Sequence, residues 1–164
     1  MTKVLILGTG FGQLPLINAC KEMDIETVGF DRNSDSLGAE LVDKFYEIDI
    51  IESAEICKIA QQEGIDGAVT MQTDAPVPTL GKLNDELGLS GVSEHTALAC
   101  SNKNLTREIL SLANVLQPKY VSVNTLIDAK AGLENIGYPC VIKAPDSSGS
   151  RGITKLNSIT DFDI

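Results

Sequence analysis

The chain has 164 residues, of which 43% are hydrophobic and 22% charged, which is typical of one globular domain or of one domain with part of another. Its formal net charge of −10 and the lack of a basic stripe exclude nucleic-acid binding. No apolar run approaches the roughly 20 residues that span a bilayer, so no membrane insertion is expected. Four scattered cysteines without a C-x-x-C pair favour small buried side chains in a reducing cytoplasm, and the single histidine, His95, cannot form a metal site alone.

The first half of the chain alternates strand and helix patterns with short connections. Residues 3–8 form a continuous apolar run, which is typical of a strand buried on both faces. This order predicts a doubly wound parallel α/β sheet, a Rossmann-like domain, over residues 1–90. The further strands are predicted at 26–31, 45–48 and 67–70, and the helices at 13–23, 54–63 and 77–87.

The pattern changes after residue 90, and residues 91–164 are expected to form an incomplete α+β subdomain. Consecutive helices are predicted at 94–100 and 102–113, and Leu105, Ile109 and Leu112 form the expected buried stripe of the second. Ser158 and Asp161 match a helix-start pattern, so the chain is expected to be cut inside a helix. The remaining predictions are a strand at 119–123, a helix at 125–135, and strands at 139–144 and 152–156.

A glycine-rich turn, Gly8-Thr9-Gly10-Phe11-Gly12, separates the first strand from the first helix, and Asp31 ends the second strand. In dinucleotide-binding folds such glycines approach a pyrophosphate and the acid binds a ribose hydroxyl. Gln13 replaces the third glycine of the G-x-G-x-x-G pattern, so a tight turn without NAD is the favoured interpretation. The alternative is a non-catalytic Rossmann-like module that binds a nucleotide or metabolite.

The loop at residues 71–78, M-Q-T-D-A-P-V-P, follows the fourth predicted strand. Ligands of open α/β sheets bind beyond the carboxyl ends of the strands. Thr73 and Asp74 are therefore candidate substrate-binding residues, together with Gly10 and Phe11 of the first turn. A helix cap explains Asp74 equally well, because Asp is favoured at helix starts.

Two lysines and a loop near the end of the chain indicate a phosphate site. Lys103 falls in the first turn of a helix, where it is either a solvated surface residue or a phosphate ligand. Lys143 interrupts an apolar strand, and because burial of an unpaired ammonium costs several kcal/mol, an anion is expected beside it. The next residues, D-S-S-G-S-R-G, offer glycine N–H groups, three hydroxyls and Arg151. A plain hairpin loop is the alternative, and no G-K-[ST] follows to make a Walker A loop.

The segments S-N-K-N-L-T-R-E-I-L and G-Y-P-C-V-I-K-A-P-D-S-S-G-S-R-G-I-T-K together resemble the N-K-x₃-R helix and the strand–loop–strand of the ATP-grasp superfamily, in its carbamoyl-phosphate-synthetase-like or biotin-carboxylase-like branch. Ala144 departs from the proline common at its position. Residues 1–90 resemble the pre-ATP-grasp domain, and residues 91–164 the first part of the ATP-grasp domain. The resemblance implies ATP phosphate contacts for Lys103, Lys143 and a flexible loop of Ser147, Ser148, Gly149, Ser150, Arg151 and Gly152.

The resemblance also implies an ATP-dependent ligase that makes an acyl phosphate from a small carboxylate, which an amine or similar nucleophile then attacks. ATP and Mg²⁺ are the implied cofactors. The second ATP-grasp subdomain, with the Mg²⁺ ligands and a catalytic arginine, would follow residue 164. The chain is therefore expected to be an amino-terminal, truncated portion that binds ATP but is inactive alone, without metal ligands of its own. Its uncovered surface is expected to form a homodimer or to receive a second chain that supplies the missing lobe.

Overall fold

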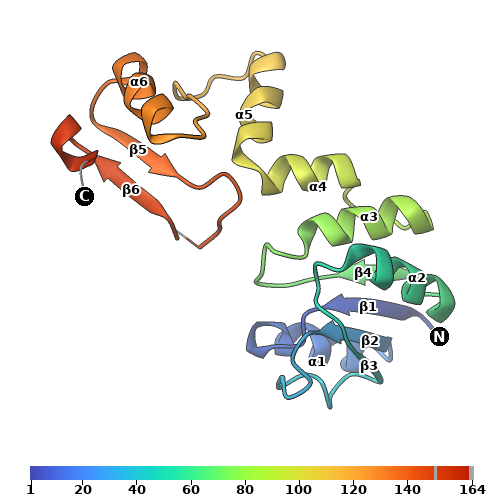
Figure 1. The fold of residues 1–164 in the computed structure, drawn as a ribbon. Coiled ribbons are helices and arrows are strands. Elements are labelled where there is room, and N and C mark those ends of the chain that lie inside the picture. The colour runs from blue at the N-terminus through green and yellow to red at the C-terminus, as the bar shows by residue number, and fades with distance from the viewer. Residues whose placement is uncertain (150, 163–164) are drawn as a thin grey trace. The chain divides into compact units, whose positions relative to one another are not determined.

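The computed structural model describes residues 1–149 and 151–162 (Figure 1). The chain divides into two compact units, Met1–Ser101 and Asn102–Ile164. The predicted division of the chain into domains at residues 1–90 and 91–164 stays a prediction. Within the described residues, no helix has the length and apolar character needed to cross a bilayer.

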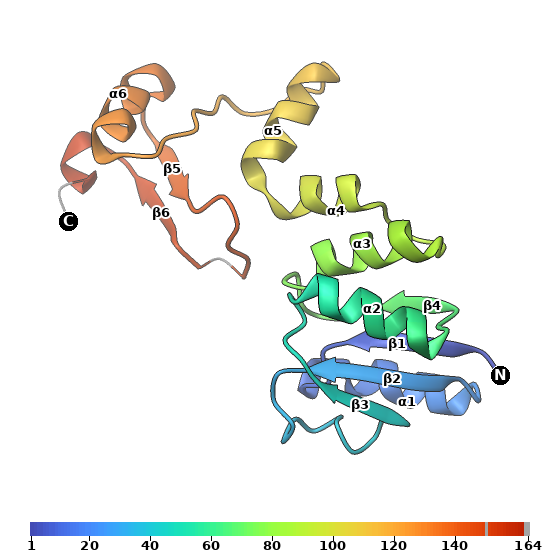
Figure 2. The ribbon, with the colours of Figure 1, turned by 45° about the vertical axis from the view of Figure 1, so that its right-hand side comes forward.

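The first unit contains the elements β1 (Lys3–Leu7), α1 (Leu14–Glu22), β2 (Glu26–Asp31), β3 (Lys44–Glu47), α2 (Ser53–Glu63), β4 (Gly67–Val69) and α3 (Val77–Leu87). Its strands form a parallel sheet with the order β3-β2-β1-β4. Alternate side chains of β1 enter different cores: Leu5 and Leu7 pack with helices α2 and α3, whereas Ile6 packs with Ile17 of α1. The sheet therefore lies between α1 and the pair α2 and α3, which can be followed in Figure 2. This arrangement confirms the predicted doubly wound α/β fold.

The direction of winding reverses beside β1. From β1 the chain moves outward through β2 to β3, and it then returns to place β4 on the other side of β1. The loops that follow β1 and β4 thus start from the carboxyl ends of neighbouring parallel strands. They flank a topological switch point, which is the place where open α/β sheets bind ligands.

Helix α4 (Glu94–Ser101) completes the first unit by packing against α3. Gly81 makes the close approach possible, because a Cβ atom there would lie 2.6 Å from the Ala97 Cβ and 2.8 Å from the Ser93 carbonyl oxygen. Ala97 is the buried residue of α4, and Cys100 is exposed. The expectation of a buried side chain is therefore wrong for Cys100, while the other three cysteines are buried.

The second unit contains helix α5 (Lys103–Leu112) and helix α6 (Leu126–Ile136), followed by the antiparallel hairpin of β5 (Cys140–Lys143) and β6 (Ile153–Leu156). Asn102 caps α5, because its side chain accepts hydrogen bonds from the backbone N–H groups of Asn104 and Leu105. The small core of the unit joins α6 to one face of the hairpin through Leu133, Cys140 and Leu156. The 3₁₀ turn η2 (Ile159–Phe162) lies where the sequence predicts the start of a helix.

Two expectations for the second unit are wrong. Helix α5 has no fully buried side chain, and Leu112 of the predicted stripe is 84% exposed, because none of the other described elements packs extensively against this helix. Residues 119–123 do not form a strand. A strand requires a partner for its backbone groups, and none of the strands within the described residues pairs with this segment.

A cluster of charges lies at the amino-terminal edge of the first unit's sheet. Glu63, at the end of α2, pairs with Lys44 of β3 and with Lys3 of β1, and it accepts a hydrogen bond from Tyr46 Oη at 2.5 Å. The hydrogen bond from Lys44, followed by that from Tyr46, holds the pKa of the Glu63 carboxyl below its ordinary value of 4.5.

We expect Gly81→Ala to destabilise the first unit by about 1–3 kcal/mol, because the added methyl group overpacks the contact between α3 and α4. Urea unfolding followed by circular dichroism measures the change. Gly67→Ala is the matched control, since its Cβ would have only Val4 Cγ2 nearby, at 4.0 Å. An equal loss of stability in both variants would contradict the packing argument.

We expect the stability advantage of the wild type over Glu63→Gln to be present at pH values above 4.5 and to disappear as the pH falls. The folded-state pKa of Glu63 is depressed, so its contribution is lost when protons bind the folded carboxylate below the ordinary value. Urea midpoints between pH 3 and pH 7 test this, with Glu55→Gln on the same helix as a control for the substitution. A stability difference between the wild type and Glu63→Gln that stays constant down to pH 3 would refute this expectation.

Candidate functional site

Lys103 holds the base of the loop between β5 and β6. Its backbone N–H donates to the Pro145 carbonyl oxygen at 2.8 Å, and its Nζ donates to the Ser147 carbonyl oxygen at 2.6 Å. The structure therefore brings together two of the predicted phosphate-binding elements, the first turn of α5 and the serine-rich loop. Lys103 is half-buried and bonded to the loop, so the interpretation as a merely solvated surface lysine is wrong.

The loop itself turns at two glycines. Gly149 and Gly152 have φ values of +64° and +63°, in the left-handed region that favours glycine. Arg151 Nε donates to the Ser148 carbonyl oxygen at 3.2 Å, so the guanidinium lies against the loop rather than extending from it. Ser147 and Ser148 are half-buried beside it. Ser150, which the sequence also assigns to the site, lies outside the described residues.

Lys143 lies on an open face of the hairpin. The strand register pairs Lys143 with Ile153 and Val141 with Lys155, and paired residues of antiparallel strands share a face. Helix α6 packs on the opposite face, so Val141 remains 54% and Ile153 47% exposed. Lys143 is exposed as well, and the expectation of a buried ammonium is wrong. The open face instead combines two ammonium groups with two aliphatic side chains.

The charge around the hairpin is opposite to that of the chain as a whole. Residues 137–156 contain three basic residues, Lys143, Arg151 and Lys155, and one acidic residue, Asp146, although the chain carries −10. Among residues 1–149 and 151–162, neither these three cations nor Lys103 takes part in an ion pair. Unpaired cations beside a glycine turn favour a ligand with several negative charges.

A second candidate site flanks the switch point of the first unit. Gly10 precedes the 3₁₀ turn η1 (Phe11–Gln13) after β1, and Phe11 is 78% exposed. Thr73 is half-buried and Asp74 exposed in the loop after β4. A bond from the Gln13 Nε2 to the Met71 carbonyl oxygen joins the two loops, so the structure brings the four predicted substrate-binding residues to one edge of the sheet.

Asp74 does not cap helix α3. The cap position is Pro76, which makes no side-chain cap bond, and Asp74 contributes only its backbone carbonyl, which accepts the Val77 N–H at 3.1 Å. The helix-cap interpretation of Asp74 is therefore wrong. Its carboxylate stays available at the switch point.

The geometry around Asp31 disfavours a dinucleotide. Its two carboxylate oxygens accept the backbone N–H groups of Thr9 and Asn33, at 2.9 and 3.0 Å, so the acid closes the glycine turn. Pro15 stands in the first turn of α1, where it removes one of the N–H groups that would face a pyrophosphate. These contacts support the interpretation of a tight turn without NAD.

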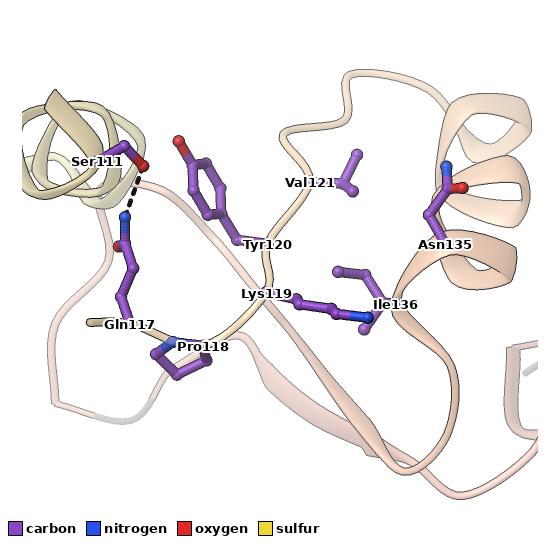
Figure 3. Close-up of a pocket in the computed structure, with 8 residues that line it drawn as sticks. All are labelled: Ser111, Gln117, Pro118, Lys119, Tyr120, Val121, Asn135 and Ile136. Atoms are coloured by element: carbon purple, nitrogen blue, oxygen red, sulfur yellow. Dashed lines mark hydrogen bonds between the residues drawn. The ribbon is translucent and has the colours of Figure 1, made fainter. Parts of the chain in front are cut away.

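Sequence reasoning missed a hollow in the second unit of about 460 Å³ (Figure 3). It lies between the end of α5, the end of α6 and the extended segment that was predicted to be a strand. Gln117 Nε2 donates to Ser111 Oγ at 2.7 Å and to the Arg107 carbonyl oxygen at 2.9 Å, which fixes one wall. No predicted site residue lines it. The lining residues are Ser111, Gln117, Pro118, Lys119, Tyr120, Val121, Asn135 and Ile136.

Within the part of the chain that the structure describes, no group of three or more His, Cys, Asp or Glu side chains could hold a metal ion.

Comparison with known proteins identifies relatives whose similarity extends over almost the whole chain. No protein-family model matches. The formate-dependent phosphoribosylglycinamide formyltransferase of Herminiimonas arsenicoxydans is 27% identical over 164 residues, which are 99% of this chain and 40% of that protein. The alanine–anticapsin ligase of Bacillus subtilis is 32% identical over 110 residues, which are 67% of this chain and 23% of that ligase.

Solved structures share the fold. The phosphoribosylglycinamide synthetase of Anaerococcus prevotii has a TM-score of 0.74 and 28% identity, over 98% of this chain and 40% of its own. The biotin carboxylase domain dimer of Hydrogenobacter thermophilus 2-oxoglutarate carboxylase, solved with MgADP, ADP and bicarbonate, has a TM-score of 0.76 and 22% identity, over 99% of this chain and 39% of its own.

The chain spans about 40% of the length of the relatives that it matches from end to end. These relatives are ATP-grasp enzymes, which confirms the resemblance read from the two sequence segments, while the branch within the superfamily stays a prediction. The chain therefore belongs to the ATP-grasp superfamily and corresponds to the amino-terminal portion of its enzymes.

Proposed function

We propose that this chain is the amino-terminal part of a cytoplasmic ATP-dependent ligase, which joins a small carboxylate to an amine or similar nucleophile through an acyl phosphate. The observation that carries the proposal is the set of unpaired cations around the glycine turn of the hairpin, Lys103, Lys143, Arg151 and Lys155. The names of the relatives support the reaction class, since one uses formate, a carboxylate, and another is a ligase of alanine.

In this proposal the nucleotide phosphates lie against the hairpin loop. Lys143 supplies a point charge on the open face, and Arg151 a second charge beside the turn. An ammonium has three N–H donors. Lys103 can therefore keep its bond to the Ser147 carbonyl and still donate to a phosphate oxygen. The loop residues that would close over the phosphates are Ser147, Ser148, Gly149, Ser150, Arg151 and Gly152.

The open face of the hairpin also suits the rest of a nucleotide. Val141 and Ile153 present exposed aliphatic surface next to the two lysines, and a flat base gains from covering such surface. Mg²⁺ is proposed to arrive with the nucleotide and to take its carboxylate ligands from the portion that this chain does not share with its relatives. That portion, or a second chain or copy, would also cover the open face.

The switch point of the first unit is the proposed acceptor site. The exposed carboxylate of Asp74 suits an amine, and the backbone of Gly10 can approach a ligand closely because it has no side chain. Phe11 and Thr73 would frame the same ligand. Residues 1–90 would then act as the pre-ATP-grasp domain, whose role is acceptor binding rather than dinucleotide binding.

We expect Lys143→Met to weaken MgADP binding to the chain about tenfold, because it removes a charge-assisted contact to phosphate. Isothermal titration calorimetry measures the dissociation constant. Lys58→Met, at an exposed lysine of α2, is the control and should leave it unchanged. Equal affinity of wild type and Lys143→Met would refute the assignment of the phosphate site.

We expect the purified chain to release no phosphate from MgATP above the enzyme-free rate, since its described residues offer no cluster of carboxylates for Mg²⁺. A coupled phosphate-release assay tests this. Magnesium-dependent turnover by the chain alone would show that it contains a complete catalytic centre, against the proposal.

A further inference from the structure

Gln13 is a buried polar side chain whose bond to Met71 joins the loops after β1 and β4, and no functional role has yet been given to it. It ends the 3₁₀ turn η1 and is only 7% exposed. Its Nε2 donates to the carbonyl oxygen of Met71, which lies 58 residues later in the loop after β4. This bond therefore crosses the switch point between the two loops of the proposed acceptor site, next to the bond that Thr70 Oγ1 donates to the Leu7 carbonyl oxygen at 2.9 Å.

The glycine turn is wrapped around the Gln13 side chain. A Cβ atom on Gly8 would lie 3.3 Å from Gln13 Cδ, and one on Gly10 would lie 3.4 Å from Gln13 Oε1. Gly8 also has a φ value of +93°, which a larger residue adopts only under strain. The side chain of Gln13 thus fills the space inside the turn, next to Gly10, where an acceptor would approach.

The loop after β4 is shaped by the same contact. Met71, whose carbonyl Gln13 binds, is followed by Gln72 at a φ value of +56°, and a Cβ atom on Gly12 would lie 3.2 Å from the Gln72 side chain. Thr73 and Asp74 come next in the chain. The bond between Gln13 and Met71 thus joins this loop to the turn of Gly10 two residues before Thr73.

We propose that Gln13 is the positioning residue of the acceptor site, which holds Thr73 and Asp74 beside Gly10 so that one small acceptor contacts both loops. The inference rests on the proposed function in one respect, the placement of the acceptor at the switch point. Gln13 acts through these residues and does not touch the acceptor.

The test uses the whole chain with Gln13→Met, which keeps the length of the side chain but removes the amide. Gln61→Met, at an exposed position of α2, is the matched control. Backbone ¹⁵N relaxation measures the order of residues 72–74. NMR titration with phosphoribosylglycinamide, the compound in the name of the formyltransferase relative, measures binding at the switch point. A parallel titration with MgADP reports on the hairpin site.

In Gln13→Met we expect the order parameters of residues 72–74 to fall from the rigid range near 0.85 to below about 0.6, while those of β1 and β2 stay rigid. The affinity for phosphoribosylglycinamide should fall on the order of tenfold, which corresponds to the upper end of the net free energy that one hydrogen bond contributes. The affinity for MgADP should stay within about twofold. The control should match the wild type in all three measurements.

Unchanged order parameters at residues 72–74 would overturn the proposal, and so would a loss of order throughout the sheet, which indicates a general structural role. If the wild type binds MgADP but gives no response to phosphoribosylglycinamide at the switch point, the positioning role is refuted and the nucleotide-binding function is supported. If MgADP does not bind but the response to phosphoribosylglycinamide depends on Gln13, the nucleotide-binding function is refuted and the positioning role is supported.

Discussion

The first unit depends on the parallel pairing of β1 with a strand on each side. Val4, Leu5 and Ile6 pair with β2 on one edge and with β4 on the other. Because β1 is central, helices cover both of its faces, and Leu5, Ile6 and Leu7 are fully buried. The same pairing places the loops after β1 and β4 at adjacent carboxyl ends, so a single constraint produces both the core and the location of the proposed acceptor site.

The second unit follows a different principle, because its hairpin is covered on one face only. Its buried core contains Leu133, Cys140 and Leu156, which is small for a stable fold. Polar contacts help to hold this unit together where apolar burial is limited. Asn102 caps α5, and Lys103 connects that helix to the hairpin loop through a hydrogen bond. The uncovered face carries two of the unpaired cations, Lys143 and Lys155. In our proposal, the incomplete burial is therefore the condition for nucleotide access.

The sequence predicts an element well when its own residue pattern determines how it is buried. It fails when burial or pairing depends on residues that are distant in the chain. The apolar run of β1 identifies a two-faced strand without further information. The similar run before Lys143 suggests the same, yet its strand belongs to a one-faced hairpin, so the lysine is exposed. The stripe of α5 and the segment 119–123 have helix and strand patterns, but among the described residues no element packs extensively against α5 and no strand pairs with residues 119–123. In the sequence, Gln13 is notable only because it replaces the third glycine of the G-x-G-x-x-G pattern. Its bond to Met71 could not be predicted, because the two residues are 58 positions apart.

The contrast between the basic hairpin and the acidic chain has a consequence for how a nucleotide would arrive. At long range a net charge of −10 repels a polyphosphate, and attraction to the hairpin operates only within about a Debye length, roughly 8 Å at physiological ionic strength. Moderate salt screens the distant repulsion more than the close attraction. Capture by this chain should therefore tolerate salt far better than capture by a uniformly basic protein, whose long-range steering is lost as ionic strength rises.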